Sequence, residues 1–359
     1  MSLPLDMRRG GVAAKPVRPQ EPVKPYPYIE EEVTIENKGA GVVLAGTLTI
    51  PPGKGSFPVV VLITGSGPQN RDEEILGHKP FLVIADALTR HGIAVLRYDD
   101  RGVAKSTGKF SGATTADFAT DVEAAVAWLR TRKDINPHRI GLIGHSEGGL
   151  IAPMVAARDK NIRFIVLLAG PGLRGEEVIL SQQQLIAQAA GGWNKEAQDM
   201  LELNRGAMDI VVRDSLRLAH RDSIRQQLRA YFAQKAGQYP VRYQDSTVAR
   251  QAIAQLSDPW MEYFLAYDPV PVLERVHCAV LAMNGAKDVQ VAPEENLVAI
   301  GRALEKGGNK HFEVKEFPDL NHLFQECKTG SPAEYGTIGQ TFSPAALEYL
   351  TNWVAKQGK

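Results

Sequence analysis

Short apolar runs rich in β-branched residues alternate with helical patterns along most of this chain. This alternation constrains the fold more than any other feature. The apolar runs cover residues 59–63, 94–96, 140–143, 162–168 and 279–283, and a more polar run covers 312–317. Continuous apolar runs are typical of strands buried on both faces. Helical spacing of apolar residues separates them at residues 80–91, 115–132, 294–306 and 344–356. Strands and helices in alternation predict an α/β fold, with a mostly parallel sheet and helices on both faces.

Two further strands are predicted before this pattern begins. Residues 33–35 and 42–50 are separated by a glycine-containing turn at residues 37–41, and the second run alternates before it ends at Pro51 and Pro52. This arrangement indicates an antiparallel hairpin at one edge of the sheet.

Residues 173–268 interrupt the alternation after the sixth strand. The segment is rich in glutamine and arginine, and its apolar residues follow helical spacing almost throughout. We therefore predict a helical insertion here, with the main domain formed by residues 29–172 and 269–359.

The first 28 residues have a different composition. Prolines recur at positions 4, 16, 19, 22, 25 and 27, with few apolar residues between them. Prolines at this density favour extended polyproline II structure, so residues 1–28 are interpreted as a linker or tail. The given chain begins with no secretory signal, which suits a cytoplasmic protein. If the proline-rich stretch marks a trimmed precursor, the protein is secreted or periplasmic.

Charge and cysteine content exclude several classes of protein. Lys and Arg total 41, as do Asp and Glu, so the formal net charge is zero, whereas nucleic-acid-binding proteins normally carry a basic excess. No apolar stretch is long enough for a transmembrane helix. Cys278 and Cys327 provide neither a disulfide framework nor a metal site. The oligomeric state stays open.

Gly144-His145-Ser146-Glu147-Gly148 lies between the predicted strand at 140–143 and a helical run. In this setting the G-x-S-x-G pattern forms a tight turn that exposes the serine at the carboxyl end of the sheet. The pattern predicts Ser146 as a nucleophile.

A serine nucleophile needs a base, and the expected chain order of serine, acid, then histidine narrows the choice among the eight histidines. His322 follows the last strand, in a loop at the carboxyl end of the sheet, and is the predicted base. His145 adjoins the serine, but its side chain is expected to point elsewhere.

The third group should orient the imidazole of His322. Asp288 follows the strand at 279–283 and is the predicted acid. Asp319 is a rival, but it stands three residues before His322 in the same loop and is poorly placed to orient it.

Two backbone N–H groups should stabilise an oxyanion. The first is that of Glu147, the residue after the nucleophile. The second is expected in the loop Thr64-Gly65-Ser66-Gly67-Pro68 after an earlier strand, with Ser66 preferred and Gly67 next, because Pro68 has no N–H.

With these motifs, residues 32–172 and 273–357 resemble the α/β-hydrolase superfamily. They are similar to bacterial esterases and lipase-like proteins of the serine aminopeptidase and dienelactone hydrolase branches. The resemblance rests on Gly65-Ser66-Gly67-Pro68, Asp99-Asp100-Arg101-Gly102, Gly144-His145-Ser146-Glu147-Gly148, Gly285-Ala286-Lys287-Asp288 and Asn321-His322. It implies an eight-stranded α/β-hydrolase fold with a helical cap after the sixth strand. It also implies a structural role near the site for Asp99 and Arg101.

The resemblance and the triad together predict a serine carboxylesterase that acts on a small-molecule ester without metal or organic cofactor. A serine aminopeptidase of the proline type is the alternative, and it would need a carboxylate for the substrate's ammonium group, such as Glu176, Glu177 or Glu147. A non-catalytic binding protein on the same fold is the third possibility. It would be marked by loss of a triad member, and none is missing.

Overall fold

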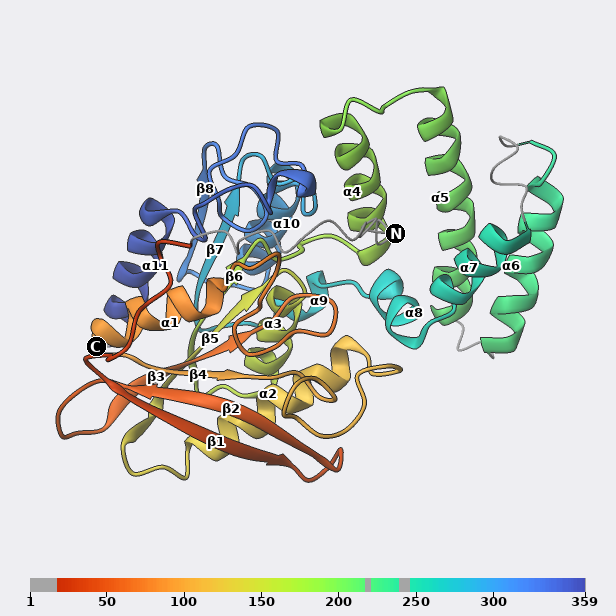
Figure 1. The fold of residues 1–359 in the computed structure, drawn as a ribbon. Coiled ribbons are helices and arrows are strands. Elements are labelled where there is room, and N and C mark those ends of the chain that lie inside the picture. The colour runs from red at the N-terminus through yellow and green to blue at the C-terminus, as the bar shows by residue number, and fades with distance from the viewer. Residues whose placement is uncertain (1–17, 217–220, 239–245, 359) are drawn as a thin grey trace, which may run out of the picture.

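The computed structural model describes residues 18–216, 221–238 and 246–358 of the 359-residue chain. The strands of these residues form one eight-stranded sheet in the order β1-β2-β4-β3-β5-β6-β7-β8 (Figure 1). They are β1 (Ile29–Asn37), β2 (Val42–Ile50), β3 (Phe57–Ile63), β4 (Ala94–Tyr98), β5 (Ile135–His145), β6 (Ile162–Leu168), β7 (Ala279–Gly285) and β8 (Phe312–Phe317). Strands β3 to β8 run parallel, whereas β1 pairs antiparallel with β2, and β2 with β4. The predicted mostly parallel sheet and its edge hairpin are confirmed.

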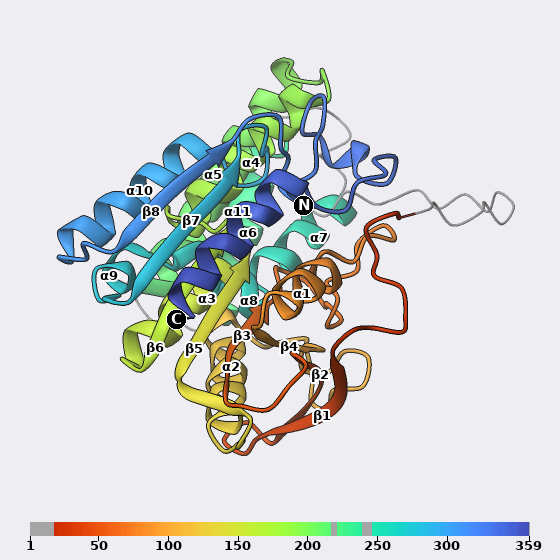
Figure 2. The same ribbon diagram turned by 90° about the vertical axis from the view of Figure 1, so that its left-hand side faces the viewer.

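Helices cover both faces of the sheet. Helices α2 (Thr115–Leu129), α3 (Gly148–Arg158) and α10 (Pro293–Lys306) bury their apolar residues against one face, together with the short α9 (Val270–Leu273). Helices α1 (Pro80–Arg90) and α11 (Pro344–Gln357) do so on the other face. Figure 2 shows α11 lying along the sheet. The helices on both faces exclude water from the central strands, and Val59, Val60 and Val61 of β3 have no exposed surface.

Strand β5 is longer than its apolar run predicted. It begins at Ile135 rather than near residue 140. Ile135 pairs with Phe57, and the register between β3 and β5 shifts before Val59 meets Ile140. The residues between Ile135 and Ile140 are mostly polar, so no apolar run marks this first part of the strand. Its extended conformation comes with the pairing to β3 and not from a local apolar pattern.

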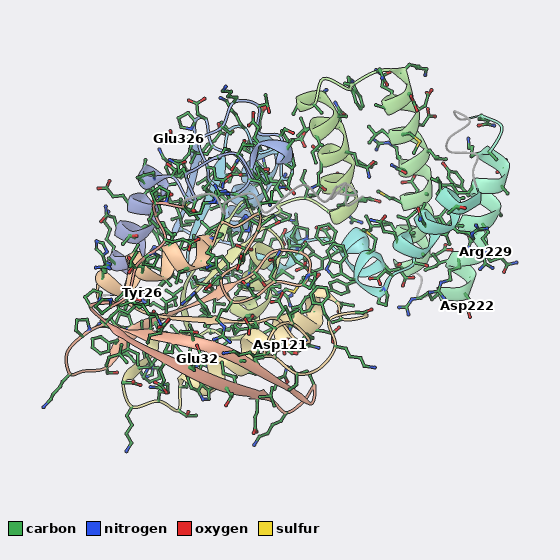
Figure 3. All side chains as sticks on the ribbon, in the orientation of Figure 1. Tyr26, Glu32, Asp121, Asp222, Arg229 and Glu326 are labelled. Carbon is green, nitrogen blue, oxygen red and sulfur yellow. The ribbon has the colours of Figure 1, made fainter. Side chains whose placement is uncertain are left out.

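The helical insertion lies between β6 and β7, as expected. It contains α4 (Gly175–Ala189), α5 (Lys195–Leu216), α6 (Arg221–Lys235), α7 (Ser246–Leu256) and α8 (Pro259–Ala266), and it extends to one side of the sheet (Figure 1). It has an apolar cluster of its own, which includes Val211, Ile224 and Leu228. Asp222 and Arg229 lie on α6 at the outer side of the insertion (Figure 3). None of the helices described here is long and apolar enough to cross a bilayer.

The described part of the proline-rich N-terminal stretch contacts the main domain. The guanidinium of Arg18 donates to the carbonyl oxygens of Leu76 and Ile338. The side-chain amide of Gln20 binds the backbone of Thr341 and Phe342. Residues 1–17 of the predicted linker or tail lie outside the described residues.

Candidate active site

Ser146 occupies a sharp turn between β5 and α3. Its φ is +52°, in the left-handed region that non-glycine residues rarely adopt. The turn is tight on both sides: a Cβ on Gly144 would lie 1.9 Å from the carbonyl oxygen of Gly148, and one on Gly148 would lie 2.3 Å from that of Ile63. Only glycine fits at these two positions. The Ser146 N–H donates to the Leu168 carbonyl at 2.8 Å, which ties the turn to the end of β6.

Asp288 and His322 come from the loops after β7 and β8 and meet at the same edge of the sheet. His322 Nδ1 donates to Asp288 Oδ2 at 2.8 Å, and both residues are buried. The other oxygen, Asp288 Oδ1, accepts the backbone N–H groups of Gln290 and Val291. The carboxylate is therefore held by backbone donors, and the bond to Nδ1 leaves His322 Nε2 available as a base.

The position of Asp319 differs from that of Asp288. Its side chain is 68% exposed and forms an ion pair with Lys287 Nζ at 2.6 Å. The partner of Asp319 is therefore Lys287, and the carboxylate bonded to His322 is that of Asp288.

The loop after β3 brings backbone N–H groups beside Ser146. A Cβ on Gly65 would lie 3.2 Å from the Cβ of Ser146, so the two backbones pack closely here. The Gly65 N–H donates to Glu73 Oε1 at 2.7 Å and is occupied. Within the described residues, the N–H groups of Ser66, Gly67 and Glu147 have no hydrogen-bond partner. These three are the N–H groups expected to face an oxyanion.

Two buried aspartates hold this loop in place. Asp99 accepts the backbone N–H of Arg71 and pairs with its guanidinium. Asp100 accepts the Thr64 hydroxyl at 2.7 Å and the Gln69 N–H at 2.9 Å. Burial raises the pKa of Asp100 to about 8, so this carboxyl keeps its proton at neutral pH.

Arg101 acts on a different element from Asp99. Its Nε donates to Asp121 Oδ2 at 2.7 Å, and its guanidinium also reaches the carbonyl oxygen of Asp117. Both partners lie on α2, whose first turn is closed by a capping box between Thr114 and Asp117. Arg101 therefore ties the loop after β4 to α2, whereas Asp99 ties it to the loop after β3.

Sequence reasoning missed a second buried carboxylate–histidine pair. His145 Nδ1 lies 2.9 Å from Glu73 Oε1, and its Nε2 lies 3.0 Å from the carbonyl oxygen of His322. The rings of His145 and His322 are 4.8 Å apart. As expected, His145 does not act toward Ser146, but it contacts the predicted base directly.

The two partners of His145 determine its charge. A carbonyl oxygen and an ionised carboxylate only accept hydrogen bonds, so both ring nitrogens must donate. Burial alone would lower the pKa of His145, but the charge of Glu73 and its hydrogen bond outweigh burial, and the pKa is raised. These contacts favour the doubly protonated form of His145, and its bond to the carbonyl oxygen of His322 holds the backbone of that residue. Its place directly before Ser146 was the only sequence signal for this contact.

The sequence named Glu147 as a candidate carboxylate for a substrate's ammonium group, but it did not reveal the partners of this side chain. It is 2% exposed and accepts hydrogen bonds from Thr115 of α2 and Trp260 of α8. Burial raises the pKa of Glu147, while these bonds and one with the Ser66 side chain favour its ionised form.

A groove separates the insertion from the Asp288 loop. On one side it is lined by Glu177, Leu180 and Gln184 of α4, and on the other by Lys287 and Val289. The insertion also contacts this loop through a hydrogen bond between the side chains of Gln182 and Gln290.

Known proteins resemble this chain in sequence and in fold. Esterase EstD of Thermotoga maritima is 27% identical over 335 residues, which cover 93% of this chain and 69% of that protein. The esterase Pf2001 of Pyrococcus furiosus superimposes with a TM-score of 0.53 at 17% identity, over 92% of this chain and 94% of that one. The α/β-hydrolase GrgF of Penicillium sp. gives a TM-score of 0.54 at 16% identity, over 92% and 99%. These two solved structures establish the α/β-hydrolase fold.

The family is established by a match to a family model over more than half of the chain. Residues 40–313 match the family described as X-Pro dipeptidyl-peptidase (S15 family), a stretch that runs from the edge hairpin to the start of β8 and includes Ser146 and Asp288. The chain therefore belongs to the S15 family and is a hydrolase of the esterase or peptidase type, on the α/β-hydrolase fold.

Proposed function

We propose that this protein is a serine carboxylesterase that hydrolyses a small-molecule ester through an acyl-enzyme on Ser146. The observation that carries the proposal is the buried Asp288–His322 hydrogen bond, at the same sheet edge as the strained turn of Ser146. Asp288 keeps the imidazole in the tautomer whose Nε2 accepts a proton.

The mechanism has two acyl-transfer steps. His322 Nε2 takes the proton of Ser146 Oγ as that oxygen attacks the ester carbonyl, and the N–H groups of Glu147 and Ser66 bind the resulting oxyanion. The tetrahedral intermediate collapses as His322 returns the proton to the leaving alcohol. Water then attacks the acyl-enzyme with His322 as base, which releases the acid and restores Ser146.

No hydrogen bond joins the Ser146 hydroxyl to His322 in the described structure. Catalytic hydrogen bonds in unliganded hydrolases are often long and shorten in the substrate complex. Ser146 follows His145 directly in the chain, and the His145 ring packs against the ring of His322, so the two proposed reacting groups lie on either side of one residue.

The names of the relatives support an ester substrate, since the chain resembles an esterase over nearly its whole length. The family name supports a second candidate, a peptidase that acts at an X-Pro sequence. Such an enzyme needs a carboxylate for the substrate's ammonium group. Glu147 is buried and already bonded, whereas Glu177 lines the groove beside Asp288 and is the better candidate of the three.

The test compares ester and peptide substrates on the same protein. We expect turnover of p-nitrophenyl acetate, butyrate or octanoate, little turnover of proline or alanyl-proline p-nitroanilide, and loss of ester turnover in Ser146→Ala. Anilide turnover with weak ester turnover would favour the peptidase. In that case Glu177→Gln should raise KM for the anilides alone. Ester turnover that survives in Ser146→Ala would refute the mechanism.

A further inference from the structure

The carboxylate that follows the proposed nucleophile joins four separate parts of the chain. Glu147 Oε1 accepts from Thr115 Oγ1 at 2.6 Å and from Trp260 Nε1 at 2.8 Å, and the Ser66 side chain lies near enough to favour the ionised form of this carboxyl. Thr115 is the first residue of α2, Ser66 lies in the loop after β3, and Trp260 belongs to α8 of the insertion.

These contacts involve a residue of the proposed oxyanion hole, because the backbone N–H of Glu147 is one of its donors. Glu147 and Ser66 supply its two proposed backbone N–H groups, and the Ser66 side chain lies near the Glu147 carboxyl. Oxyanion donors act only when they are held close to the position of the developing charge. A change in the hydrogen bonds of the Glu147 carboxylate therefore reaches both donors at once.

Trp260 connects this carboxylate to the insertion. The side chain of Asp258 caps α8 by accepting the backbone N–H of Trp260. The indole ring of Trp260 stacks on the ring of Phe264, with ring centroids 5.1 Å apart. The backbone of Phe264 packs against Gly175 at the start of α4, where a Cβ would lie 1.8 Å from the Phe264 carbonyl oxygen. The indole therefore moves with both ends of the insertion. If α8 shifts from the sheet, the buried Glu147 carboxyl loses a hydrogen-bond donor, which is costly for a buried polar group.

We propose that Glu147 is a positioning residue that couples the seating of the helical insertion to the geometry of the oxyanion hole, through its hydrogen bond with Trp260. The coupling rests on the proposed function, because it presupposes acyl transfer at Ser146. When α8 is seated, the Glu147 carboxylate has all its donors and the loop of Ser66 is held for the oxyanion. When α8 is displaced, the carboxylate turns toward other donors and the oxyanion hole loosens.

Trp260→Phe tests the coupling most directly, because it keeps an aromatic side chain at this position and removes the indole N–H together with the five-membered part of the ring. Loss of a whole oxyanion donor lowers kcat about 10²–10³-fold. Because the donors are displaced and not removed in Trp260→Phe, we expect a smaller loss of kcat, about 10-fold. KM for p-nitrophenyl butyrate should change less than about twofold. Tyr267→Phe is the matched control at the same junction: its buried hydroxyl has no hydrogen-bond partner in the described residues, so kcat should stay within about twofold of wild type.

Two further measurements separate coupling from general loss of stability. Affinity for a trifluoromethyl ketone, which forms a tetrahedral adduct with serine, should fall in Trp260→Phe in proportion to kcat/KM. In the double variant Glu147→Gln/Trp260→Phe, the loss of kcat should not exceed the larger single loss, because both changes break one interaction. Additive losses, or a lower melting temperature with unchanged kcat and adduct affinity, would overturn the coupling.

The same variants, together with Ser146→Ala, test the proposed function separately from the coupling. Unchanged kcat in Trp260→Phe, with no turnover in Ser146→Ala, would overturn the coupling and leave the esterase proposal standing. Turnover in Ser146→Ala would overturn the esterase proposal, and the coupling with it.

Discussion

The sheet and the helical insertion bury their apolar residues in different ways. The sheet lies between two layers of helices, with a cluster of buried side chains on each face. The insertion has one smaller cluster between its own helices, and ion pairs such as Arg221–Glu262 lie at its surface. A helix layer that packs on one side only buries less apolar surface, so its displacement costs less free energy.

The residues of the proposed site also divide between the sheet and the insertion. Ser146, Asp288 and His322 all follow strands of the sheet, where buried neighbours fix the ends of the strands. The insertion contributes Trp260, which contacts the site from behind, and the α4 side of the groove beside Asp288. We infer that the sheet holds the reacting groups and that the insertion governs what reaches them.

The largest expected effect tests the role of the sheet. Asp288→Asn keeps an oxygen for the backbone donors but presents an amide to His322, which favours the wrong tautomer. The corresponding change in serine proteases lowers kcat about 10⁴-fold, and we expect a loss of that order in p-nitrophenyl butyrate hydrolysis with little change in thermal unfolding. Asp319→Asn, in an exposed ion pair nearby, is the control and should keep full activity. Equal losses in both variants would contradict the assignment.

The next effect compares the two apolar clusters. Leu142 of β5 and Leu228 of α6 are both fully buried, and truncation of such a leucine to alanine costs about 2–5 kcal/mol. We expect Leu142→Ala to lower the stability of the whole sheet and Leu228→Ala to loosen the insertion alone. Hydrogen exchange should then rise over α5 to α8 in Leu228→Ala while β5 and β6 stay protected. Faster exchange over the whole chain in both variants would mean that sheet and insertion unfold as one unit.

The last comparison concerns a protonated carboxyl held inside the main domain. Because burial raises the pKa of Asp100 to about 8, the native protein keeps this proton at pH values where the unfolded chain, with a pKa of about 3.9, has lost it. The free energy of unfolding should therefore fall as pH rises from about 4 to about 8, by up to about 1.4 kcal/mol per pH unit for one proton.

Asp100→Asn should flatten this pH dependence, which thermal unfolding at several pH values would measure. The amide can donate to Thr64 and accept from Gln69, so both contacts are kept. Glu262→Gln, in the surface ion pair of the insertion, should leave the slope unchanged. The same slope in Asp100→Asn as in wild type would show that Asp100 is ionised in the folded protein.

The sequence predicted the sheet because its strands are apolar over consecutive residues, as in β3 and β6. It also led to Asp288 and His322, since residues after parallel strands gather at one edge. It did not reveal Glu73 or Trp260, whose partners are 72 and 113 residues away. No local pattern marks a polar contact between distant loops, so these two residues read as an ordinary loop glutamate and an ordinary helix tryptophan.

The two outer strands of the sheet have a consequence for association between molecules. Strands β1 and β8 end the sheet, and each leaves one row of backbone groups without a neighbouring strand. Charged side chains line both, with Glu30, Glu31 and Glu32 on β1 and Glu313, Lys315 and Glu316 on β8. Charges on an outer strand oppose the addition of a strand from another chain. These edges therefore protect the protein from sheet-to-sheet aggregation, and we expect any self-association to use its helical surfaces.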